Sequence, residues 1–338
     1  MAASPNDDVV AAVINFNTAA LTRRCTRSLL DAGIARILVL DNASAADDYR
    51  SLESAHAPES EGVRIIRSED NLGFAQGSNF LIDEALRDPR CQRVLLVNSD
   101  AVVEAKGLDT CLGAMKAGGH DLMGGRMLKP GPDGAVDSLG IALYKSLLAS
   151  NRKSTEDAYL GPTGGLAIYS RAFLERVGAA HGYVFDPAYF CYAEDTDLCV
   201  RARLMGFSVG YTDEVVALHE GQASNAGQYN DFILYHGIRN SIWMAAKSIP
   251  GWIVFTQLPW MLLLHAGIVV RHTLQGRIRT LFRLYRDAFA GLPAAMKARK
   301  AVQASRQVTP GEFRAFIDGQ FYETAFLRGA IGDLFRRR

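Results

Sequence analysis

Four short apolar runs stand out in the first hundred residues, and each is followed by polar residues. They are VVAAVIN at 9–15, RILVLD at 36–41, VRIIR at 63–67 and RVLLVN at 93–98. Because they are rich in β-branched residues and leucine without regular alternation, they predict strands that are covered on both faces. Strands of this kind are typical of a buried parallel sheet.

Helical periodicity fills two of the intervals between these runs. Apolar residues recur at helical spacing from Leu21 to Ala32, and Gly33 follows as a helix terminator. Residues 75–86 (AQGSNFLIDEAL) show a second helical pattern. Alternating strands and helices predict an α/β fold with an open sheet, which binds ligands beyond the carboxyl ends of its strands.

The chain changes character near its C-terminal third. Residues 248–270 contain no Asp, Glu, Lys or Arg, and this length is sufficient to cross a bilayer. Two prolines, Pro250 and Pro259, and basic residues on both sides are a poor fit to a spanning helix. We expect the segment to lie on or dip into the cytosolic leaflet, followed by a basic helix that faces anionic lipid. Burial in a helical subdomain and a true span are the alternatives.

The charge distribution supports a division into two parts. Residues 1–250 carry 23 Lys and Arg against 31 Asp and Glu, whereas residues 251–338 carry 14 against 5. We therefore expect an acidic body, 1–250, and an apolar and basic helical region, 251–338. Nucleic acid is not an expected partner, because the basic residues are accompanied by long apolar runs and the body is acidic.

Cysteine usage and the N-terminus indicate the compartment. Five scattered cysteines without a CxxC pair indicate buried thiols in a reducing environment. The first ten residues, MAASPNDDVV, lack the basic region and apolar core of a secretory signal. We expect a cytoplasmic protein that associates peripherally with the inner leaflet of the cell membrane.

Polar side chains follow the predicted strands, where a sheet of this class binds its ligand. They are Asn15 and Asn17, Asp41 and Asn42, and Asn98, Ser99 and Asp100. Neither GxGxxG after the first strand nor GxxxxGK[ST] occurs, so the two commonest phosphate-binding loops are missing. Any nucleotide must be held in another way.

Three carboxylates, Glu194, Asp195 and Asp197, begin a predicted helix after an aromatic-rich run. A carboxylate at this position suits helix capping, because it meets unpaired N–H groups and the positive end of the dipole. Asp197 precedes Arg201 by four residues, the spacing of a surface ion pair on a helix, which predicts a structural role. For Glu194 and Asp195, capping and catalysis remain open on the residues alone.

Seven motifs, in order, resemble an inverting family 2 glycosyltransferase, most closely the bacterial rhamnosyltransferase type. They are VINFN at 13–17, VLDNAS at 39–44, NLGFAQGSN at 71–79, LLVNSDAVV at 95–103, GPTGGLAIYSRAFLERVG at 161–178, YFCYAEDTDLCVRARLMGFSVGY at 189–211 and LHEGQAS at 218–224. The resemblance covers about residues 9–240. It implies a GT-A fold, which is a Rossmann-like, mostly parallel open sheet with flanking helices, and a nucleotide-sugar-dependent catalytic domain at 1–250.

The resemblance assigns nucleotide contacts to five residues. Phe16 and Asn17 match the segment that lines the base, and Asp41 matches the carboxylate that accepts a hydrogen bond from the base imide. Asn71 and Gly73 match the loop that passes the ribose. A simple turn at 41–44 and a helix-entry loop at 71–73 are the structural alternatives.

A metal site is also implied by the resemblance. Asn98, Ser99 and Asp100 stand where the family has a metal-binding DxD motif, with Asn in place of the first Asp. Asp100 and His219 would bind Mg²⁺ or Mn²⁺ together with the donor's diphosphate. A histidine that closes a strand and bonds to backbone is the alternative for His219. Because Asn98 departs from the motif, an inactive nucleotide-sugar-binding module on the same fold is the alternative function.

The resemblance makes Asp195 the base that deprotonates the acceptor hydroxyl, with Glu194 orienting acceptor or base. The expected function is inverting, non-processive transfer of a sugar to a hydroxyl of a lipid-linked or cell-envelope glycan. The first choice of donor is dTDP-L-rhamnose, followed by a UDP-hexose or a UDP-N-acetylhexosamine. A processive synthase is not expected, because the chain lacks a QxxRW motif and several spanning helices. A homo-oligomer is left open.

Overall fold

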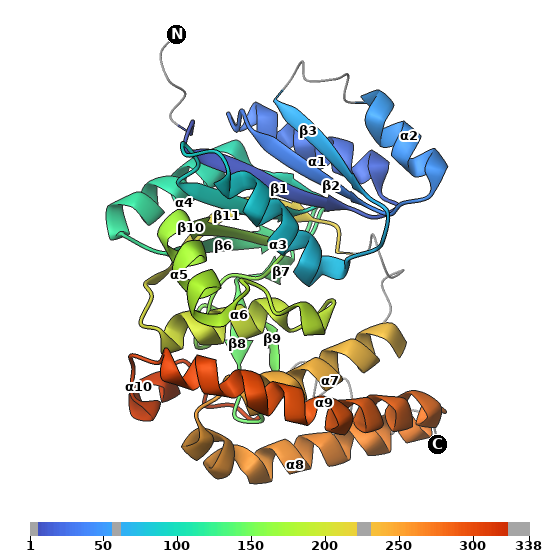
Figure 1. Cartoon of the computed structure of the whole chain (residues 1–338), viewed down its shortest axis with the longest axis vertical. Helices are drawn as coiled ribbons and strands as arrows, with labels where there is room; N and C mark the ends of the chain where they lie inside the picture. Colours follow the sequence, from blue (N-terminus) through green and yellow to red (C-terminus); the bar gives the residue numbers. More distant parts are fainter. Residues whose placement is uncertain (1–5, 56–61, 222–230, 324–338) are drawn as a thin grey trace. The chain divides into compact units, whose positions relative to one another are not determined.

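The computed structural model describes residues 6–55, 62–221 and 231–323 (Figure 1). The chain divides into two compact units. The first is drawn from Met1–Gly140, Gly161–Cys191 and Phe207–Gln228, and the second from Ile141–Leu160, Tyr192–Gly206 and Tyr229–Arg338. Each unit is built from segments that are distant in sequence.

A sheet of nine strands forms the centre of the first unit, counted over the described residues. Its strands are β1 (Val9–Asn15), β2 (Ile37–Asn42), β3 (Val63–Ser68), β4 (Arg93–Asn98), β5 (Ala101–Val103), β6 (Leu122–Leu128), β7 (Val136–Ser138), β10 (Leu166–Ser170) and β11 (Val209–His219). The order is β3-β2-β1-β4-β10-β6-β11-β5, and β7 pairs with β6. All four strands expected from the apolar runs are present.

The sheet is parallel in one half and mixed in the other. Strands β3, β2, β1 and β4 are parallel, as the connecting helices require. Beyond β4, β10 pairs antiparallel with both β4 and β6, and β11 is parallel to β6 but antiparallel to β5. The expected α/β class is confirmed, whereas the parallel pairing dominates only in the N-terminal half of the sheet.

Helices flank this sheet in the first unit (Figure 1). They are α1 (Ala19–Asp31), α2 (Ala46–Ala55), α3 (Gly73–Leu86), α4 (Ala105–Gly118), α5 (Arg171–His181) and the 3-10 helix η1 (Pro187–Tyr189). The predicted apolar face of α1 is buried at Cys25 and Leu29, which pack in one cluster with Val9, Ala11 and Val13 of β1. Burial of both sheet faces explains why the strand sequences do not alternate.

The second unit is mainly helical. It contains the hairpin β8 (Ile141–Leu143) and β9 (Ala149–Asn151), together with α6 (Glu194–Leu204), α7 (Asp231–Lys247), α8 (Gly251–Leu274), α9 (Ile278–Ala304) and α10 (Pro310–Arg314). Leu234 and Ile238 of α7 pack against Leu284 of α9. Leu264 of α8 packs against Ala142 and Tyr144, in and beside the hairpin.

Helix α8 confirms the expected apolar helix near the C-terminus. Among the described residues, it is the helix that is long and apolar enough to cross a membrane by length and composition. One side is buried at Ile253, Gln257, Leu264 and His272. Most of the remaining apolar side chains of α8, and several of α9, are exposed. We call this exposed set the apolar face: Trp252, Phe255, Leu258, Trp260, Leu262, Leu263, Val269, Val270 and Leu274 of α8, and Ile278, Phe282, Phe289 and Met296 of α9.

Candidate active site

The pairing of the parallel strands brings their polar ends to one edge of the sheet. Asn15 at the end of β1 is in register with Asp41 of β2, and Ile14 is in register with Asn98 of β4. Parallel strands end at the same edge, so the expected clustering of these side chains follows from the register. The first unit therefore gathers polar side chains at the edge where open α/β sheets bind their ligands.

Asn15 organises this edge, although no specific role was predicted for it. Its side-chain nitrogen lies 2.9 Å from Asp41 Oδ1, 3.0 Å from Ser44 Oγ and 3.0 Å from Asp48 Oδ2. Its side-chain oxygen accepts a hydrogen bond of 2.6 Å from Thr22 Oγ1. A fully buried amide that uses both of its atoms fixes the positions of its neighbours.

Asp41 is left with one unused oxygen in this network. Oδ1 accepts from Asn15, whereas Oδ2 has no hydrogen-bond partner in the described part of the chain and lies 3.7 Å from Arg67 Nε. The Arg67 guanidinium in turn lies over the ring of Tyr49, 4.1 Å from its centroid. An unsatisfied buried carboxylate oxygen is unfavourable unless a ligand donates to it, which agrees with the expected contact to a base N–H.

Asn17 connects the loops that follow β1 and β2. Its backbone N–H donates to Ser44 Oγ at 2.9 Å, and its side-chain oxygen accepts from the Ala45 N–H at 2.8 Å. Asn17 and Ala43 both adopt left-handed backbone conformations, with φ of 56° and 61°. Phe16, by contrast, is exposed. The turn expected as the structural alternative at 41–44 is therefore present, and it holds the polar residues in place.

The loop before α3 places Asn71 and Gly73 beside Phe190. Asn71 Oδ1 accepts from the Gly73 N–H at 2.9 Å and from Asn42 Nδ2 at 3.0 Å. Gly73 has φ of 68°, and a Cβ atom there would lie 2.5 Å from the Phe190 ring. The glycine is thus required by packing within the unit, and its expected contact with a ribose stays a prediction.

Asp100 and His219 are brought together by a short antiparallel pairing. Ala101, directly after Asp100, is in register with His219 at the end of β11. Nε2 of His219 lies 3.1 Å from Asp100 Oδ1 and 3.3 Å from the Asn98 amide nitrogen. Nδ1 lies 2.7 Å from Oδ2 of Asp137, which β7 supplies. His219 therefore closes a strand, but its ring bonds to carboxylates and not to backbone.

This arrangement favours the protonated form of the His219 imidazole. Burial is the largest single influence and lowers the pKa of the imidazole, but hydrogen bonds to Asp100 and Asp137 and their charges outweigh it and raise the pKa to about 9. Asp137 was missed in the sequence because no motif surrounds it. Its contact with Nδ1 is the arrangement that orients metal-binding histidines.

The described residues contain no cluster of three or more His, Cys, Asp or Glu side chains suited to hold a metal alone. Asp100 offers a carboxylate oxygen, and His219 offers Nε2 once it has lost its proton. Two protein ligands fit Mg²⁺ or Mn²⁺ when a substrate diphosphate supplies others. The residues present thus fit a metal shared with a diphosphate.

The second unit contains the expected catalytic carboxylates at the start of α6. Tyr192 and Ala193 precede them in left-handed conformations, each with φ of 66°. Non-glycine residues in this region cost about 1–3 kcal/mol each and gather at functional sites. Asn240 of α7 holds the turn, because its Nδ2 donates to the Tyr192 carbonyl at 2.7 Å and its side chain is fully buried.

Asp195 and Asp197 behave differently in α6. Asp195 Oδ1 accepts a hydrogen bond of 2.6 Å from the Thr196 N–H, so part of the capping interpretation is observed. Asp197 is fully buried and bonds to Arg201 Nε at 2.8 Å, Lys247 Nζ at 2.9 Å and Ser248 Oγ at 2.6 Å. The expected pair with Arg201 is present, but its expected surface position is wrong, because Lys247 at the end of α7 and Ser248 after it cover the carboxylate.

The Glu194 carboxyl is buried with few interactions that would stabilise its negative charge. Burial and the neighbouring charges of Asp195 and Asp197 raise the pKa of Glu194 well above its usual value. Its Oε2 has no hydrogen-bond partner among the described residues. A protonated Glu194 is therefore favoured in the folded chain, and its O–H is available to donate.

Glu194→Gln tests this state through the pH dependence of stability. Because the folded-state pKa is raised, the wild-type carboxyl stabilises the fold fully below its unfolded pKa of about 4.3 and progressively less as pH rises toward the folded-state value. Glutamine does not titrate, so its melting temperature relative to wild type should be higher at pH 7.5 than at pH 4.5. Differential scanning calorimetry at both pH values measures this. An equal difference at the two values would contradict a raised pKa.

The parallel half-sheet with polar strand ends, the antiparallel extension through β10 and the Asp100–His219 pair define a GT-A fold. Two solved structures share this fold. The first 349 residues of TarS from S. aureus match with a TM-score of 0.52 and 14% identity, over 95% of this chain and 92% of that chain. GalNAc-T7 with UDP, GalNAc and Mn²⁺ matches with a TM-score of 0.53 and 12% identity, over 77% of this chain but only 50% of that chain.

Comparison with known sequences indicates which proteins of this fold the chain resembles. Residues 11–178 match the model of Glycosyl transferase family 2. A curated relative is the Low-salt glycan biosynthesis hexosyltransferase Agl10 of Haloferax volcanii. It is 21% identical over 255 residues, which cover 72% of this chain and 76% of the relative.

Proposed function

We propose that the protein is an inverting, non-processive glycosyltransferase that acts in glycan biosynthesis at the cytosolic face of a membrane. The observation that carries this proposal is the polar edge of a family 2 domain, where Asp41 has an unsatisfied buried oxygen and Asp100 meets His219. The relative Agl10 is named as a hexosyltransferase of glycan biosynthesis, which supports transfer of a hexose-type sugar. dTDP-L-rhamnose remains the first donor to test, with UDP-hexoses and UDP-N-acetylhexosamines next.

In this proposal, the edge of the first unit holds the donor. Asp41 Oδ2 accepts from the imide N–H of a uracil or thymine base, and Asn15 holds Asp41 in place. Phe16 and Asn17 line the base, Asn71 and Gly73 pass the ribose, and Asn98 and Asp100 contact the sugar diphosphate. All seven contacts rest on the match of sequence motifs and await a ligand-bound structure.

Asp195 is the proposed base. Its carboxylate takes the proton of the acceptor hydroxyl while the oxygen attacks the anomeric carbon, and the bond to the diphosphate breaks in the same step. Glu194, whose raised pKa favours its protonated form, donates a hydrogen bond that orients the acceptor. Strained residues at 192 and 193 fix the backbone ahead of both side chains.

A divalent ion, when bound, would stabilise the negative charge of the departing diphosphate. Asp100 and His219 would hold it, with Asp137 keeping His219 oriented through Nδ1. GalNAc-T7, which shares the fold, is described with Mn²⁺. This likeness and the donor set support Mg²⁺ or Mn²⁺.

Two substitutions distinguish the role of Asp100, the proposed metal ligand, from that of Asp137, which orients His219. Asp137→Asn should weaken metal affinity and metal-dependent turnover by about 10–100-fold, because loss of a carboxylate partner misorients the metal-binding histidine. Asp100→Asn should have a larger effect, because it removes a direct ligand. Turnover titrated with Mn²⁺ measures both. Unchanged metal dependence in Asp100→Asn would contradict the proposed site.

A panel of sugar nucleotides with Mg²⁺ or Mn²⁺ tests the function. Thermal shift reports binding, and release of nucleoside diphosphate reports turnover. The proposal predicts metal-dependent release from at least one donor. A donor that binds but is never turned over would instead favour an inactive binding module, the alternative raised by Asn98.

The second unit supports peripheral membrane association. Trp252, Phe255 and Phe282 of the apolar face are 66%, 68% and 71% exposed. Protein covers the opposite side of α8 from Ile253 to His272, whereas a spanning helix is expected to be apolar around its circumference. A one-sided apolar surface is typical of a helix that lies in the plane of the interface. We therefore propose that residues 251–338 form a membrane-surface region attached to a catalytic domain at 1–250.

Replacing two exposed phenylalanines tests this association. Burial of each side chain in lipid contributes about 1.5–3 kcal/mol, so Phe255→Ser with Phe282→Ser should lower vesicle affinity by at least about tenfold. Vesicle flotation measures the bound fraction. Phe80→Ser, the same change at an exposed position of α3, is the control and should bind like wild type. Unchanged flotation of the double variant would remove the apolar face as the membrane contact.

A further inference from the structure

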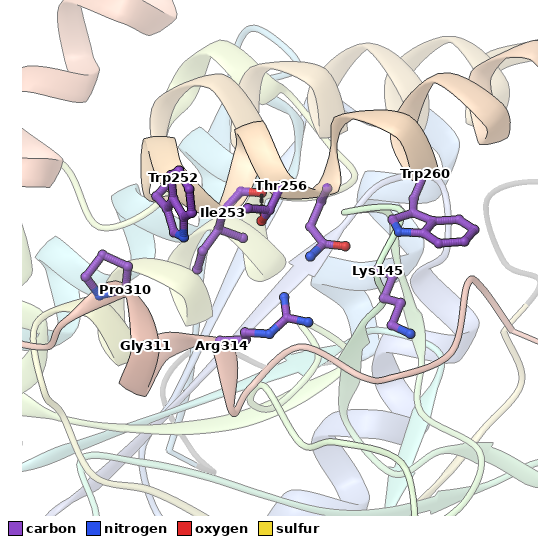
Figure 2. Close-up of a pocket in the computed structure, with 9 residues that line it drawn as sticks. Lys145, Trp252, Ile253, Thr256, Trp260, Pro310, Gly311 and Arg314 are labelled. Atoms are coloured by element: carbon purple, nitrogen blue, oxygen red, sulfur yellow. Dashed lines mark hydrogen bonds between the residues drawn. The ribbon is translucent and has the colours of Figure 1, made fainter.

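A cavity of about 470 Å³ lies within the second unit beneath α8 (Figure 2). Trp252, Thr256, Gln257 and Trp260 line it from α8, and Arg314 lines it from the end of α10. Lys145, in the turn between β8 and β9, lines it as well. Its volume is within the range of small-ligand sites, and the proposed catalytic residues do not contribute to it.

The lining of this cavity is positively charged. Lys145 and Arg314 contribute two cations, and no Asp or Glu is among the lining residues. In the orientation that satisfies both amide atoms, Gln257 accepts from Arg314 Nη1 at 2.7 Å and donates to the Lys145 carbonyl at 3.2 Å. Gln257 is 3% exposed, so it fixes the Arg314 guanidinium from the buried side of α8.

The two cations are not neutralised within the described part of the chain. Among the described residues, no ion pair joins Arg314 or Lys145 to a carboxylate, and Lys145 Nζ makes no hydrogen bond. Figure 2 shows the Arg314 side chain pointing toward α8. Two cations that line one cavity without a carboxylate partner among the described residues favour an anionic ligand. A guanidinium binds phosphate through paired hydrogen bonds.

The same cavity is continuous with the apolar face. Trp252 and Trp260 belong to both, lie eight residues apart on α8, and are 66% and 42% exposed. Figure 2 shows these indoles at the two ends of the cavity. Tryptophan is enriched at the level of lipid headgroups, where its ring meets acyl chains and its N–H meets polar groups. A ligand here would present phosphate to the cations and apolar chains to the exposed side of α8.

We propose that this cavity binds the phosphate-bearing headgroup of an anionic membrane lipid. The inference rests on the membrane-surface part of the proposed function and deepens it, since it gives that surface a specific lipid ligand. The positive charge of the cavity favours a phosphate group as its ligand. Because the cavity is continuous with the apolar face, a lipid is a more suitable source of that phosphate than soluble phosphate. Lipid binding here would hold α8, α10 and the β8–β9 turn together, because all three line the cavity.

Vesicle flotation of the full chain tests the proposal. Wild-type protein is mixed with vesicles of phosphatidylcholine alone or with one fifth phosphatidylglycerol, in 150 mM salt. The preference for anionic vesicles should fall by about 30-fold when Lys145→Gln and Arg314→Gln are combined, on the basis of about 1 kcal/mol per cation at the surface. Binding to phosphatidylcholine alone should stay unchanged, because the apolar face is intact.

A matched variant distinguishes binding of a lipid in the cavity from general electrostatic attraction of the basic region to anionic vesicles. Arg279→Gln with Lys297→Gln removes the same charge from exposed positions of α9 and should keep most of the preference. Equal losses in both double variants would overturn the proposal. Lys145→Gln alone provides a second readout that keeps the Arg314–Gln257 hydrogen bond, and it should lose a smaller part of the preference with an unchanged melting temperature.

The remaining outcomes separate the source of phosphate and the underlying membrane proposal. Inorganic phosphate at 5 mM should not release wild-type protein from anionic vesicles. A melting-temperature shift with inorganic phosphate that Arg314→Gln abolishes, without any change in vesicle preference, would replace lipid by soluble phosphate and contradict the proposal. Equal binding of wild-type protein to both vesicle types would contradict the headgroup site but leave the membrane-surface proposal intact. Wild type that binds neither would remove the membrane surface as well.

Discussion

Asp195→Asn is expected to reduce sugar transfer by about 10²–10⁴-fold while donor affinity stays close to wild type. The amide cannot take the proton of the acceptor hydroxyl, and general-base catalysis is worth about this factor. Its oxygen can still accept the hydrogen bond from the Thr196 N–H, so the start of α6 should remain intact. Nucleoside diphosphate release measures transfer, and calorimetric titration with the donor measures affinity.

The control for this substitution is Asp88→Asn. Asp88 also bonds a nearby backbone N–H, that of Arg90, and lies in the loop between α3 and β4. It should retain turnover. Near-normal turnover in Asp195→Asn would remove the base assignment, and a parallel fall in melting temperature and donor affinity would assign Asp195 to capping alone.

Asp197→Ala is expected to destabilise the protein by about 3–5 kcal/mol, because it leaves two buried cations without their shared counter-ion. Although burial alone would raise the pKa of Asp197, the charges of Lys247 and Arg201 and the hydrogen bond from Ser248 hold it at about 2. This depressed pKa contributes stability that is complete above the unfolded pKa near 3.9 and is lost as pH falls toward 2. Urea denaturation at pH 7 measures the change in free energy of unfolding.

Glu175→Ala provides the matched control. Arg171 and Glu175 have the same spacing on α5 and a similar distance of 2.7 Å, but the Glu175 side chain is 53% exposed. An exposed pair contributes under about 1 kcal/mol. A loss in Asp197→Ala no larger than the loss in Glu175→Ala would contradict the buried network.

Local sequence patterns predicted the elements of the fold where burial is uniform. The runs at 9–15 and 93–98 are strands because both faces of the sheet are covered, and continuous apolar sequence reports this directly. The direction of β10 was beyond such patterns, since a strand buried on two faces has the same composition in either orientation. The division of the chain into interleaved units was also missed, because the β8–β9 hairpin and α6 join the C-terminal helices through contacts that are distant in sequence.

In the candidate site, residues within sequence motifs were predicted, whereas residues that contact them from distant strands were missed. Asp41, Asp100 and Asp195 lie in motifs, and strand ends or helix starts mark their positions. Asn15 contacts Asp41 and Asp137 contacts His219, in each case from another strand. Only the pairing of β1 with β2, and of β6 with both β7 and β11, brings them within hydrogen-bond distance. The burial of Asp197 depends on Lys247, fifty residues away, so spacing within α6 correctly gave its partner but not its environment.

The central claim is that the sugar is transferred in a single displacement, with Asp195 as the base and Asp100 among the residues that hold the donor's diphosphate. Nuclear magnetic resonance of the first product formed from a donor of known anomeric configuration tests this most directly. The account predicts the opposite configuration at the anomeric carbon of the product, because a single displacement inverts it. A product that retains the donor's configuration would contradict the account.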